Sequence, residues 1–232
     1  MTLVPLKQAL SQVLKGAKPL DAEEIPLSNA QGRILASGLK AQRAQPPFAA
    51  SAMDGYAVRV DDVQSVPVDL NVVGEAPAGH GYMGRVRKGQ AVRIFTGAPL
   101  PKGTDTIVIQ ENTERDGDTV RINEGTPDPG HVRPSGGDFS KGQQVIDAGT
   151  QLLPRHIALA AAMGYSKLTV HRKPVAAILA TGDELVEPGT SPGPGQIVAS
   201  NSYALASMVK SAGGSPRLLG IASDTLEDLR HK

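Results

Sequence analysis

Five oxygen-bearing side chains lie in segments that the sequence predicts to be loops: Asp54, Thr96, Asp138, Glu184 and Asp224. Each alone has an ordinary explanation as a turn former, a strand terminator, a loop acid or a helix cap. Together, carboxylates and a hydroxyl from separate loops suit Mg²⁺, which binds phosphate oxygens and neutralises charge as a phosphoanhydride breaks. Backbone N–H groups of the glycine-rich loops suit an oxyanion. These residue types therefore predict metal-assisted chemistry on a phosphorylated substrate.

The motifs of several other common chemistries do not occur. Cysteine is absent, which excludes disulfides, thiolate metal sites and a thiol nucleophile. None of the five histidines pairs with another at the helical spacing of zinc ligands. Neither a Walker lysine loop nor a Gly-x-Ser-x-Gly elbow is present. The glycines of residues 79–84 match a dinucleotide fingerprint in spacing, but strand-like residues follow them, so we interpret the segment as a glycine-rich loop.

Composition argues against nucleic acids and membranes as partners. Lys and Arg number 24 and Asp and Glu number 23, so no overall field attracts a polyanion. Aromatic residues make up 3% and Trp is absent, which removes the usual stacking surfaces for nucleic acid. No apolar run is long enough to span a bilayer, and residues 1–18 show no signal-like pattern. We expect a soluble protein of the cytoplasm.

A stiff loop and a tight turn position Asp54. Two prolines at 46–47 fix extended backbone, and Asp54-Gly55 then forms a turn at the start of an apolar strand. The region that follows is rich in short strands, and we expect the turn Asp116-Gly117 to join the last two of them. Many short strands at close spacing predict a small β-barrel or sandwich. The predicted strands are residues 56–60, 69–73, 91–95, 106–110 and 119–122.

Helical patterns flank this strand-rich region. Residues 5–17 carry apolar side chains at helical spacing, which predicts an amphipathic helix. Ser28 is a candidate cap for a second helix that contains Ile34 and ends at Gly38. Residues 153–163 predict a third helix, with a proline in the first turn and a glycine past the end. This order is compatible with a β domain inserted between two halves of a mixed domain.

Strand and helix patterns alternate after residue 173. Residues 174–180 form a continuous apolar run, as expected for a strand buried on both faces. A helix from Asn201, a strand at 217–222 and a helix capped by residues 223–225 complete a β-α-β-α order, and open α/β sheets bind ligands at the strand ends. Two strands do not make a stable parallel sheet, so we expect an interrupted domain. Leu205, Met208 and Val209 are expected to face inward from the first of these helices.

Four motifs together resemble one protein family. The string Ser-Ala-Met-Asp-Gly-Tyr-Ala at residues 51–57 resembles the signature of the molybdopterin molybdotransferases, the MoeA and gephyrin E-domain family. The other motifs follow in the family's order, and the similarity covers essentially the whole chain. The four motifs are residues 51–58, residues 93–101, residues 133–138 with 141–142, and residues 180–185 with 200–203.

The resemblance implies a multidomain fold of the α+β and α/β classes. Residues 1–48 and 139–172 would form a discontinuous, elongated α/β dimerisation domain, residues 49–138 an inserted small β-barrel-like domain, and residues 173–232 a partial three-layer α/β molybdopterin-binding domain. It also implies a homodimer with the active cleft between the second domain of one subunit and the third of the other. The end of the third domain and the family's fourth domain have no counterpart here, which leaves open whether these residues are active alone.

The implied reaction transfers molybdenum from molybdate to the dithiolene sulfurs of adenylylated molybdopterin, with Mg²⁺ on the phosphates and release of AMP. Other proteins of molybdenum cofactor biosynthesis are implied partners. The family's catalytic positions correspond to Asp54, Thr96, Asp138 and Glu184, and its substrate-binding positions to Gly97, Gly182, Asp183, Ser200, Asn201, Ser202 and Asp224. We hypothesise that Asp54 and Glu184 place metal or activated water, whereas Thr96 and Asp138 orient substrate.

Two other functions compete with this one. A non-catalytic dimerisation or scaffold module is one alternative, since gephyrin-like relatives also organise partners. The acids in their motif contexts favour the enzyme, because a pure scaffold does not need them. A general Mg²⁺-dependent nucleotide hydrolase is weaker, because no phosphate-binding loop is present.

Overall fold

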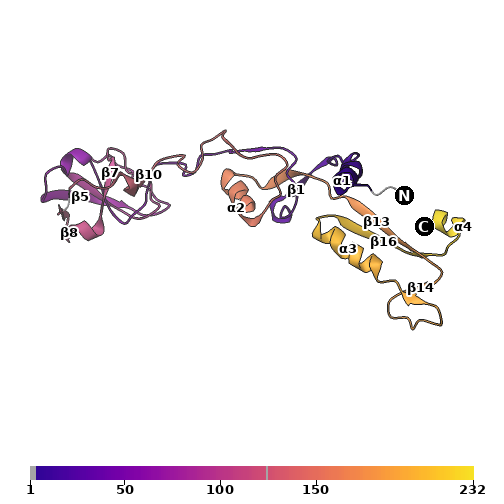
Figure 1. Cartoon of the computed structure of the whole chain (residues 1–232). Helices are drawn as coiled ribbons and strands as arrows, with labels where there is room; N and C mark the ends of the chain where they lie inside the picture. The colour runs from indigo at the N-terminus through magenta and orange to yellow at the C-terminus, as the bar shows by residue number, and fades with distance from the viewer. Residues whose placement is uncertain (1–3, 124) are drawn as a thin grey trace. The chain divides into compact units, whose positions relative to one another are not determined.

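The computed structural model describes residues 4–123 and 125–232, which divide into two units (Figure 1). Of these residues, the β unit comprises 39–123, 125–146 and Ala158–Tyr165, and the terminal unit comprises 4–38, Asp147–Ile157 and Ser166–Lys232. The helix α2 (Pro154–Met163) has residues in both. Its bounds agree with the helix predicted at 153–163, and Gly164 follows it at a φ of 106°. This two-way division does not test the predicted three-domain boundaries, which stay predictions.

A six-stranded sheet in the order β7-β4-β6-β5-β9-β8 forms the centre of the β unit. The β5–β6 pair is parallel, and the other neighbours are antiparallel. The strands are β4 (Gly55–Val58), β5 (Val68–Ala76), β6 (Gln90–Ile94), β7 (Thr106–Ile109), β8 (Thr113–Asp116) and β9 (Thr119–Ile122). Five of them confirm the predicted strands, with small differences at their ends.

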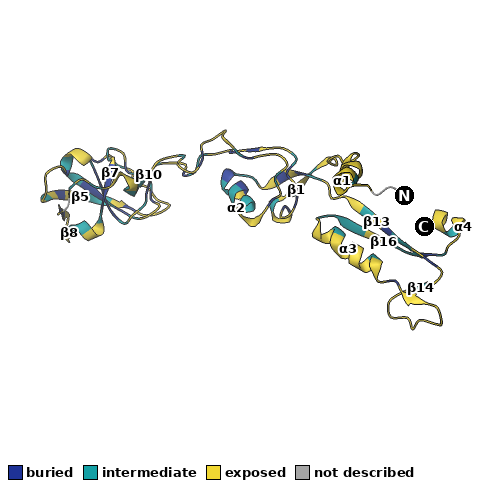
Figure 2. Ribbon diagram, viewed as in Figure 1, coloured by how far each residue is buried: buried dark blue, intermediate teal, exposed yellow. Residues whose placement is uncertain are grey.

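Apolar side chains cover both faces of this sheet. Alternation along β4 places Tyr56 and Val58 in one apolar cluster, with Leu70 and Ile122, and Ala57 in the other, with residues such as Val92 and Ile107. All four residues of β4 are therefore buried. The strand β4, which follows Asp54, is therefore covered by apolar side chains on both faces. Buried residues of this sheet are dark blue in Figure 2.

The Asp116-Gly117 turn does not join the two strands that the sequence analysis assigned to it. It joins β9 to β8, whereas β7 ends earlier and the short 3₁₀ helix η3 (Gln110–Asn112) intervenes. The strand β8 has the sequence Thr-Glu-Arg-Asp and lies mostly exposed at the edge of the sheet. An exposed edge strand needs no apolar alternation, so it left no signal in the sequence.

Two short antiparallel ladders complete the β unit. One pairs β2 (Leu39–Lys40) with β11 (Gln144–Ile146), and the other pairs β3 (Ala50–Ser51) with β10 (Val132–Arg133). Further 3₁₀ helices are η2 (Val60–Asp62) and η4 (Pro129–His131). The glycine-rich segment 79–84 is a loop, as predicted.

The terminal unit begins with α1 (Leu6–Leu14), the predicted amphipathic helix. An antiparallel ladder of β1 (Ala22–Pro26) and β12 (Lys167–His171) follows. The buried Arg33 supports this ladder, because its guanidinium forms an ion pair with Glu23 and donates to the carbonyl oxygen of His171 at 2.7 Å.

The predicted second helix from Ser28 to Gly38 is wrong. Only the 3₁₀ turn η1 (Leu27–Asn29) forms, and the chain then turns at Gly32, where φ is 76°. Ile34 and Leu35 are extended and form isolated bridges to distant residues of the chain. Leu35 is fully buried in this arrangement. Non-local pairing has thus overridden a helical pattern of only about three turns.

The last sixty residues have the predicted β-α-β-α order. Parallel strands β13 (Val175–Thr181) and β16 (Ser215–Ala222) pack against α3 (Asn201–Ser211), and α4 (Leu226–His231) follows (Figure 1). A second parallel ladder joins β14 (Leu185–Val186) to β15 (Ile197–Val198).

Two burial expectations for this segment are wrong. In β13 only Ile178 is buried, so the strand is not covered on both faces. In α3 the side chains of Leu205 and Met208 are 49% and 66% exposed, and Val209 is half-buried. One helix and two strands do not offer enough partner surface to cover these apolar side chains, and Figure 2 shows α3 largely in yellow.

Gly55 permits the close approach of β4 to β7, which gives a stability prediction. A Cβ atom there would lie 2.0 Å from the carbonyl oxygen of Val108, a backbone atom that no rotamer can move. We expect Gly55→Ala to destabilise the β unit by about 1–3 kcal/mol or more. Urea unfolding followed by the amide NMR signals of β4 and β6 measures this. Gly81→Ala is the control, because its Cβ would meet only Pro99 side-chain atoms at 3.6 Å and beyond. Equal stability of both variants would contradict the prediction.

Candidate functional site

Asp54 and Thr96, two of the predicted catalytic residues, are in direct contact. Asp54 ends the loop between β3 and β4, and Thr96 follows β6. The Oδ1 atom of Asp54 accepts hydrogen bonds from the backbone N–H of Thr96 at 2.7 Å and from its hydroxyl at 2.8 Å. Because β4 and β6 are neighbours, the sheet brings together two residues that are 42 positions apart.

Backbone hydrogen bonds hold the two loops against each other. The Gly97 N–H donates to the carbonyl oxygen of Ser51 at 2.8 Å, and the Ser51 N–H donates to that of Ala98 at 2.9 Å. Gly97 has a φ of 84°, a conformation that glycine adopts without strain. The hydroxyl of Ser51 closes the turn before Asp54, since it donates to the carbonyl oxygen of Met53 and accepts from its N–H. The predicted substrate residue Gly97 is therefore a fixed part of the Asp54 site.

These hydrogen bonds keep Asp54 ionised. The backbone N–H of Thr96 lowers the pKa of the Asp54 carboxyl most, and the Thr96 hydroxyl lowers it further. Desolvation opposes this shift, and the positive charge of Arg93 adds a smaller lowering of the pKa. A half-buried carboxylate with one oxygen engaged is a suitable ligand or hydrogen-bond acceptor for a bound substrate.

Asp138 lies in the same unit on an adjoining loop. The Nη2 atom of Arg133 donates to both carboxylate oxygens of Asp138, at 3.0 Å to Oδ1 and 3.1 Å to Oδ2. Arg133 pairs with Ala50 in the β10–β3 ladder, so the ladder joins the Asp138 loop to the strand before Asp54. The Asp138 N–H donates to the carbonyl oxygen of Gln45 at 2.8 Å, next to the predicted proline loop.

The predicted acids of the terminal unit gather at the carboxyl ends of β13 and β16. The Oδ1 atom of Asp183 accepts from the Asp224 N–H at 3.1 Å, and the Gly182 N–H donates to the carbonyl oxygen of Ala222 at 3.1 Å. The Glu184 carboxylate lies against Gly182, where a Cβ atom would be 2.6 Å from its Oε2 atom. Glycine at 182, with a φ of 146°, leaves room for this acid.

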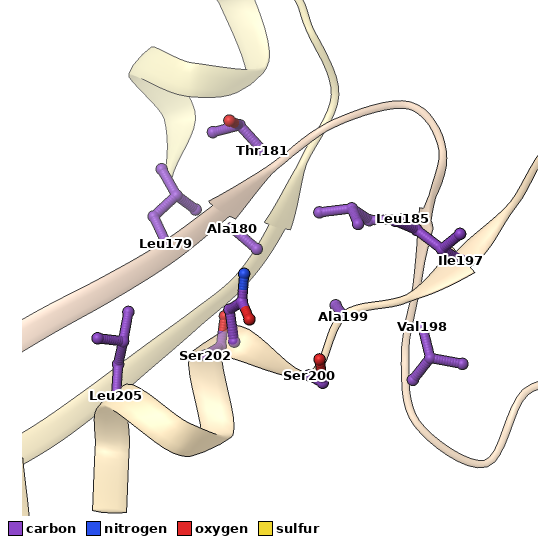
Figure 3. Close-up of a pocket in the computed structure, with 11 residues that line it drawn as sticks. Leu179, Ala180, Thr181, Leu185, Ile197, Val198, Ala199, Ser200, Ser202 and Leu205 are labelled. Atoms are coloured by element: carbon purple, nitrogen blue, oxygen red, sulfur yellow. The ribbon is translucent and has the colours of Figure 1, made fainter. Parts of the chain in front are cut away.

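A pocket of about 280 Å³ lies beside these strand ends (Figure 3). The predicted substrate residues Ser200, Asn201 and Ser202 contribute one wall, at the start of α3. Mainly apolar side chains of β13, β14 and β15, together with Thr181 and with Leu205 of α3, form the rest, and Figure 3 shows Leu179, Leu185 and Ile197 on these strands. The first N–H groups of a helix attract anions, so a pocket with polar groups at the helix start and apolar side chains opposite suits an anionic ligand.

The predicted residues fall into two groups, one in each unit. The β unit contains Asp54, Thr96, Gly97 and Asp138, and the terminal unit contains Gly182, Asp183, Glu184, Ser200, Asn201, Ser202 and Asp224. Within residues 4–123 and 125–232, no cluster of three or more His, Asp or Glu side chains could hold a metal ion. A metal shared by Asp54 and Glu184 therefore stays a prediction.

A clamp that was not predicted from the sequence holds the Asp224 loop. The Oδ2 atom of Asp228 accepts from the Ser223 N–H at 2.7 Å and from its hydroxyl at 3.0 Å. The Thr225 hydroxyl accepts from the Asp228 N–H at 3.2 Å, which confirms the predicted capping segment. The spacing Thr-x-x-Asp was the available signal, since it resembles a capping box.

This clamp gives a pH prediction. The Ser223 N–H and hydroxyl lower the pKa of Asp228 below the ordinary aspartate value of about 3.9, and the positive charges of Lys232 and His231 add to this. A depressed pKa means that the clamp is fully formed above the ordinary value and is lost as the pH falls through the lowered one. We expect the Ser223 amide proton shift to titrate with a midpoint below 3.9, and Asp228→Asn to abolish this titration. A midpoint at or above 3.9 would disprove the clamp.

Within the described ranges, no helix is long and apolar enough to cross a membrane.

The family model for the MoeA N-terminal region (domain I and II) matches residues 4–164. A molybdopterin molybdenumtransferase of Nostoc sp. is 46% identical over 209 residues, which are 88% of this chain and 48% of the relative. Molybdopterin molybdenumtransferase 2 of Mycobacterium tuberculosis is 36% identical over 94% of this chain and 54% of its own length.

A solved structure agrees with the sequence comparisons. The molybdopterin biosynthesis moeA protein of Pyrococcus horikoshii OT3 superposes with a TM-score of 0.93 at 34% identity, over 99% of this chain and 62% of that one. The chain spans about half the length of the curated relatives it matches. The family model alone covers more than half of the chain, from the amphipathic helix to the end of α2. The chain belongs to the MoeA family.

Proposed function

We propose that this chain provides the N-terminal part of a molybdopterin molybdenumtransferase, which inserts molybdenum from molybdate into adenylylated molybdopterin and releases AMP. The relatives with this name are about twice as long, so the activity is proposed for the whole protein. The observation that carries the proposal is the Asp54–Thr96 contact, because an ionised carboxylate held by a threonine lies in the segment that most resembles the family signature.

The pocket of the terminal unit supports an organic anion as the substrate. Its apolar walls suit a ring system, and the Ser200–Ser202 segment at the start of α3 offers N–H and hydroxyl donors to phosphate oxygens. Glu184 and Asp183 lie at the end of the same strand, β13, where they would meet groups that project from the pocket. In this proposal Thr96 and Asp138 orient the substrate.

Magnesium is the proposed cofactor. Mg²⁺ typically takes one or two carboxylates plus substrate phosphates and water, so it does not need a protein-only cluster of acids. Asp54 fits this donor set, because only its Oδ1 atom is engaged by Thr96. When bound, Mg²⁺ would neutralise phosphate charge as AMP leaves. Asp54 and Glu184 are the proposed protein ligands of the Mg²⁺ ion.

The proposed location of the whole protein is the cytoplasm.

The proposed assembly is the family homodimer, built from a discontinuous α/β domain, a β-barrel-like domain and a three-layer molybdopterin-binding domain. The helix α1 supports an interface, since none of its residues is buried. Leu6, Leu10, Val13 and Leu14 are each more than half exposed. Such a contiguous apolar face typically marks a contact with another chain.

The direct test is molybdate-dependent conversion of adenylylated molybdopterin to the active cofactor, with AMP release followed in parallel. The Nostoc relative is the positive control, and this chain is assayed alone and mixed with the C-terminal half of that relative. Activity of the mixture or of the chain supports the proposal. If the relative is active and the mixture neither binds molybdopterin nor turns it over, the scaffold alternative replaces it.

Asp54→Asn gives the sharpest substitution for the site. Asn keeps the shape of the side chain and removes its charge, so the fold is retained and the proposed metal and phosphate contacts are lost. We expect AMP release to fall by about 10²-fold or more in whichever sample is active, the chain alone or its mixture with the C-terminal half of the relative. The melting temperature should stay close to that of the parent chain. Asp61→Asn, an exposed acid of the same unit, is the control and should keep full activity. Retained activity in Asp54→Asn would remove this residue from the mechanism.

Leu10→Glu tests the proposed homodimer. A charge in the middle of the α1 apolar face makes burial against a second copy unfavourable, and we expect a dimeric parent to become monomeric at micromolar concentration. Analytical ultracentrifugation measures the change. Gln12→Glu adds the same charge to α1 at a polar position and should leave the dimer intact. Identical sedimentation of Leu10→Glu and the parent would rule out α1 as the interface.

A further inference from the structure

Arg93 lies close to the Asp54 site and has none of the predicted catalytic or binding roles. It lies on β6, directly opposite Tyr56 of β4 in the antiparallel register. Its guanidinium is 5.3 Å from the centre of the Tyr56 ring and 4.8 Å from that of Phe95. Both distances are within the range of cation–π contacts, so the two rings help to hold the guanidinium in place.

The hydrogen bonds of Arg93 reach the residues that flank Asp54. Its Nη1 atom donates to the carbonyl oxygen of Gly55 at 3.2 Å, and its Nη2 atom donates to the Oε1 atom of Gln110 at 2.6 Å. The backbone N–H of Gln110 in turn donates to the carbonyl oxygen of Asp54 at 3.0 Å. Arg93 therefore binds the residue after Asp54 and the residue that holds its backbone.

Arg93 also reaches the other partner of the pair. Phe95, which its guanidinium contacts, is the residue before Thr96. One side chain thus contacts an immediate neighbour of both Asp54 and Thr96: Gly55 at the start of β4 and Phe95 directly after β6. Such contacts restrict the separation of the two loops, whose hydrogen bonds depend on loop positions at the level of tenths of an ångström.

We propose that Arg93 is a positioning residue, which fixes the loops of Asp54 and Thr96 so that the carboxylate stays on the threonine N–H and hydroxyl. The proposal rests on the proposed function only in treating this pair as part of the active site. This role requires arginine, because one planar guanidinium donates hydrogen bonds to two acceptors and contacts two aromatic rings at the same time. The single ammonium group of lysine does not do both.

The test compares amide NMR spectra and hydrogen exchange of this chain and its variants. In Arg93→Met we expect the Thr96 amide proton to move upfield and to exchange about tenfold faster, as for a loss of one hydrogen bond, while core amides of β4 and β7 keep their protection. Arg93→Lys should give an intermediate shift and exchange rate. Arg121→Met is the matched control, because it removes an arginine of the same sheet that pairs with Asp69 instead.

A second variant keeps the test informative if Arg93→Met does not fold. Gln110→Ala removes the Oε1 acceptor and keeps the backbone N–H on Asp54, so we expect a smaller change at Thr96 in the same direction. An unchanged Thr96 amide in Arg93→Met overturns the proposal, as does equal loss of protection throughout the sheet, which would make Arg93 merely structural. None of these measurements uses the transferase reaction. The test of Arg93 is therefore valid even if the chain is inactive, and a negative result for Arg93 does not contradict the proposed transferase function.

Discussion

The site in the β unit depends on the burial of β4 between two neighbours. All four residues of this strand are buried, and Gly55 lets its backbone approach that of β7 more closely than any side chain would allow. Asp54 immediately precedes this strand, so it has little freedom of its own. Thr96 follows the neighbouring strand β6 and meets the carboxylate with two hydrogen bonds. Packing of the sheet therefore sets the geometry of a polar site at its end.

The terminal unit uses a different arrangement to place polar groups. Parallel strands β13 and β16 end together, and the loops that follow them bring Asp183 and the Asp224 backbone into contact. The Asp228 clamp stabilises the second of these loops. This part of the chain leaves apolar side chains of α3 uncovered, so its polar loops are held by hydrogen bonds more than by a deep core. Its pocket is correspondingly open to a ligand at the helix start.

Membership of the MoeA family and the local geometry are independent observations, and both support the proposed transferase function. The family model and the relatives rest on sequence, whereas the Asp54–Thr96 and Arg133–Asp138 contacts rest on packing. An ionised, oriented carboxylate suits a cation that would in turn bind phosphate oxygens, and the backbone N–H groups of the fixed glycine loops suit the anion itself. Arg93 adds a reason for the rigidity of this site, because two aromatic rings, the carbonyl oxygen of Gly55 and the side chain of Gln110 hold its guanidinium.

The sequence by itself determined the family, five of the six strands of the main sheet, the amphipathic α1, the helix α2 and the relative order of β13, α3, β16 and α4. Apolar alternation, proline and glycine positions and a capping segment are local signals, and each of these elements follows from them. The tertiary structure alone decided that Ile34 and Leu35 are extended, that β8 forms an edge strand and that α3 stays exposed. It also decided which distant residues meet, since strand register brings Asp54 to Thr96 and Arg93 to Gln110. Register depends on contacts between residues distant in the chain, and no local pattern encodes them.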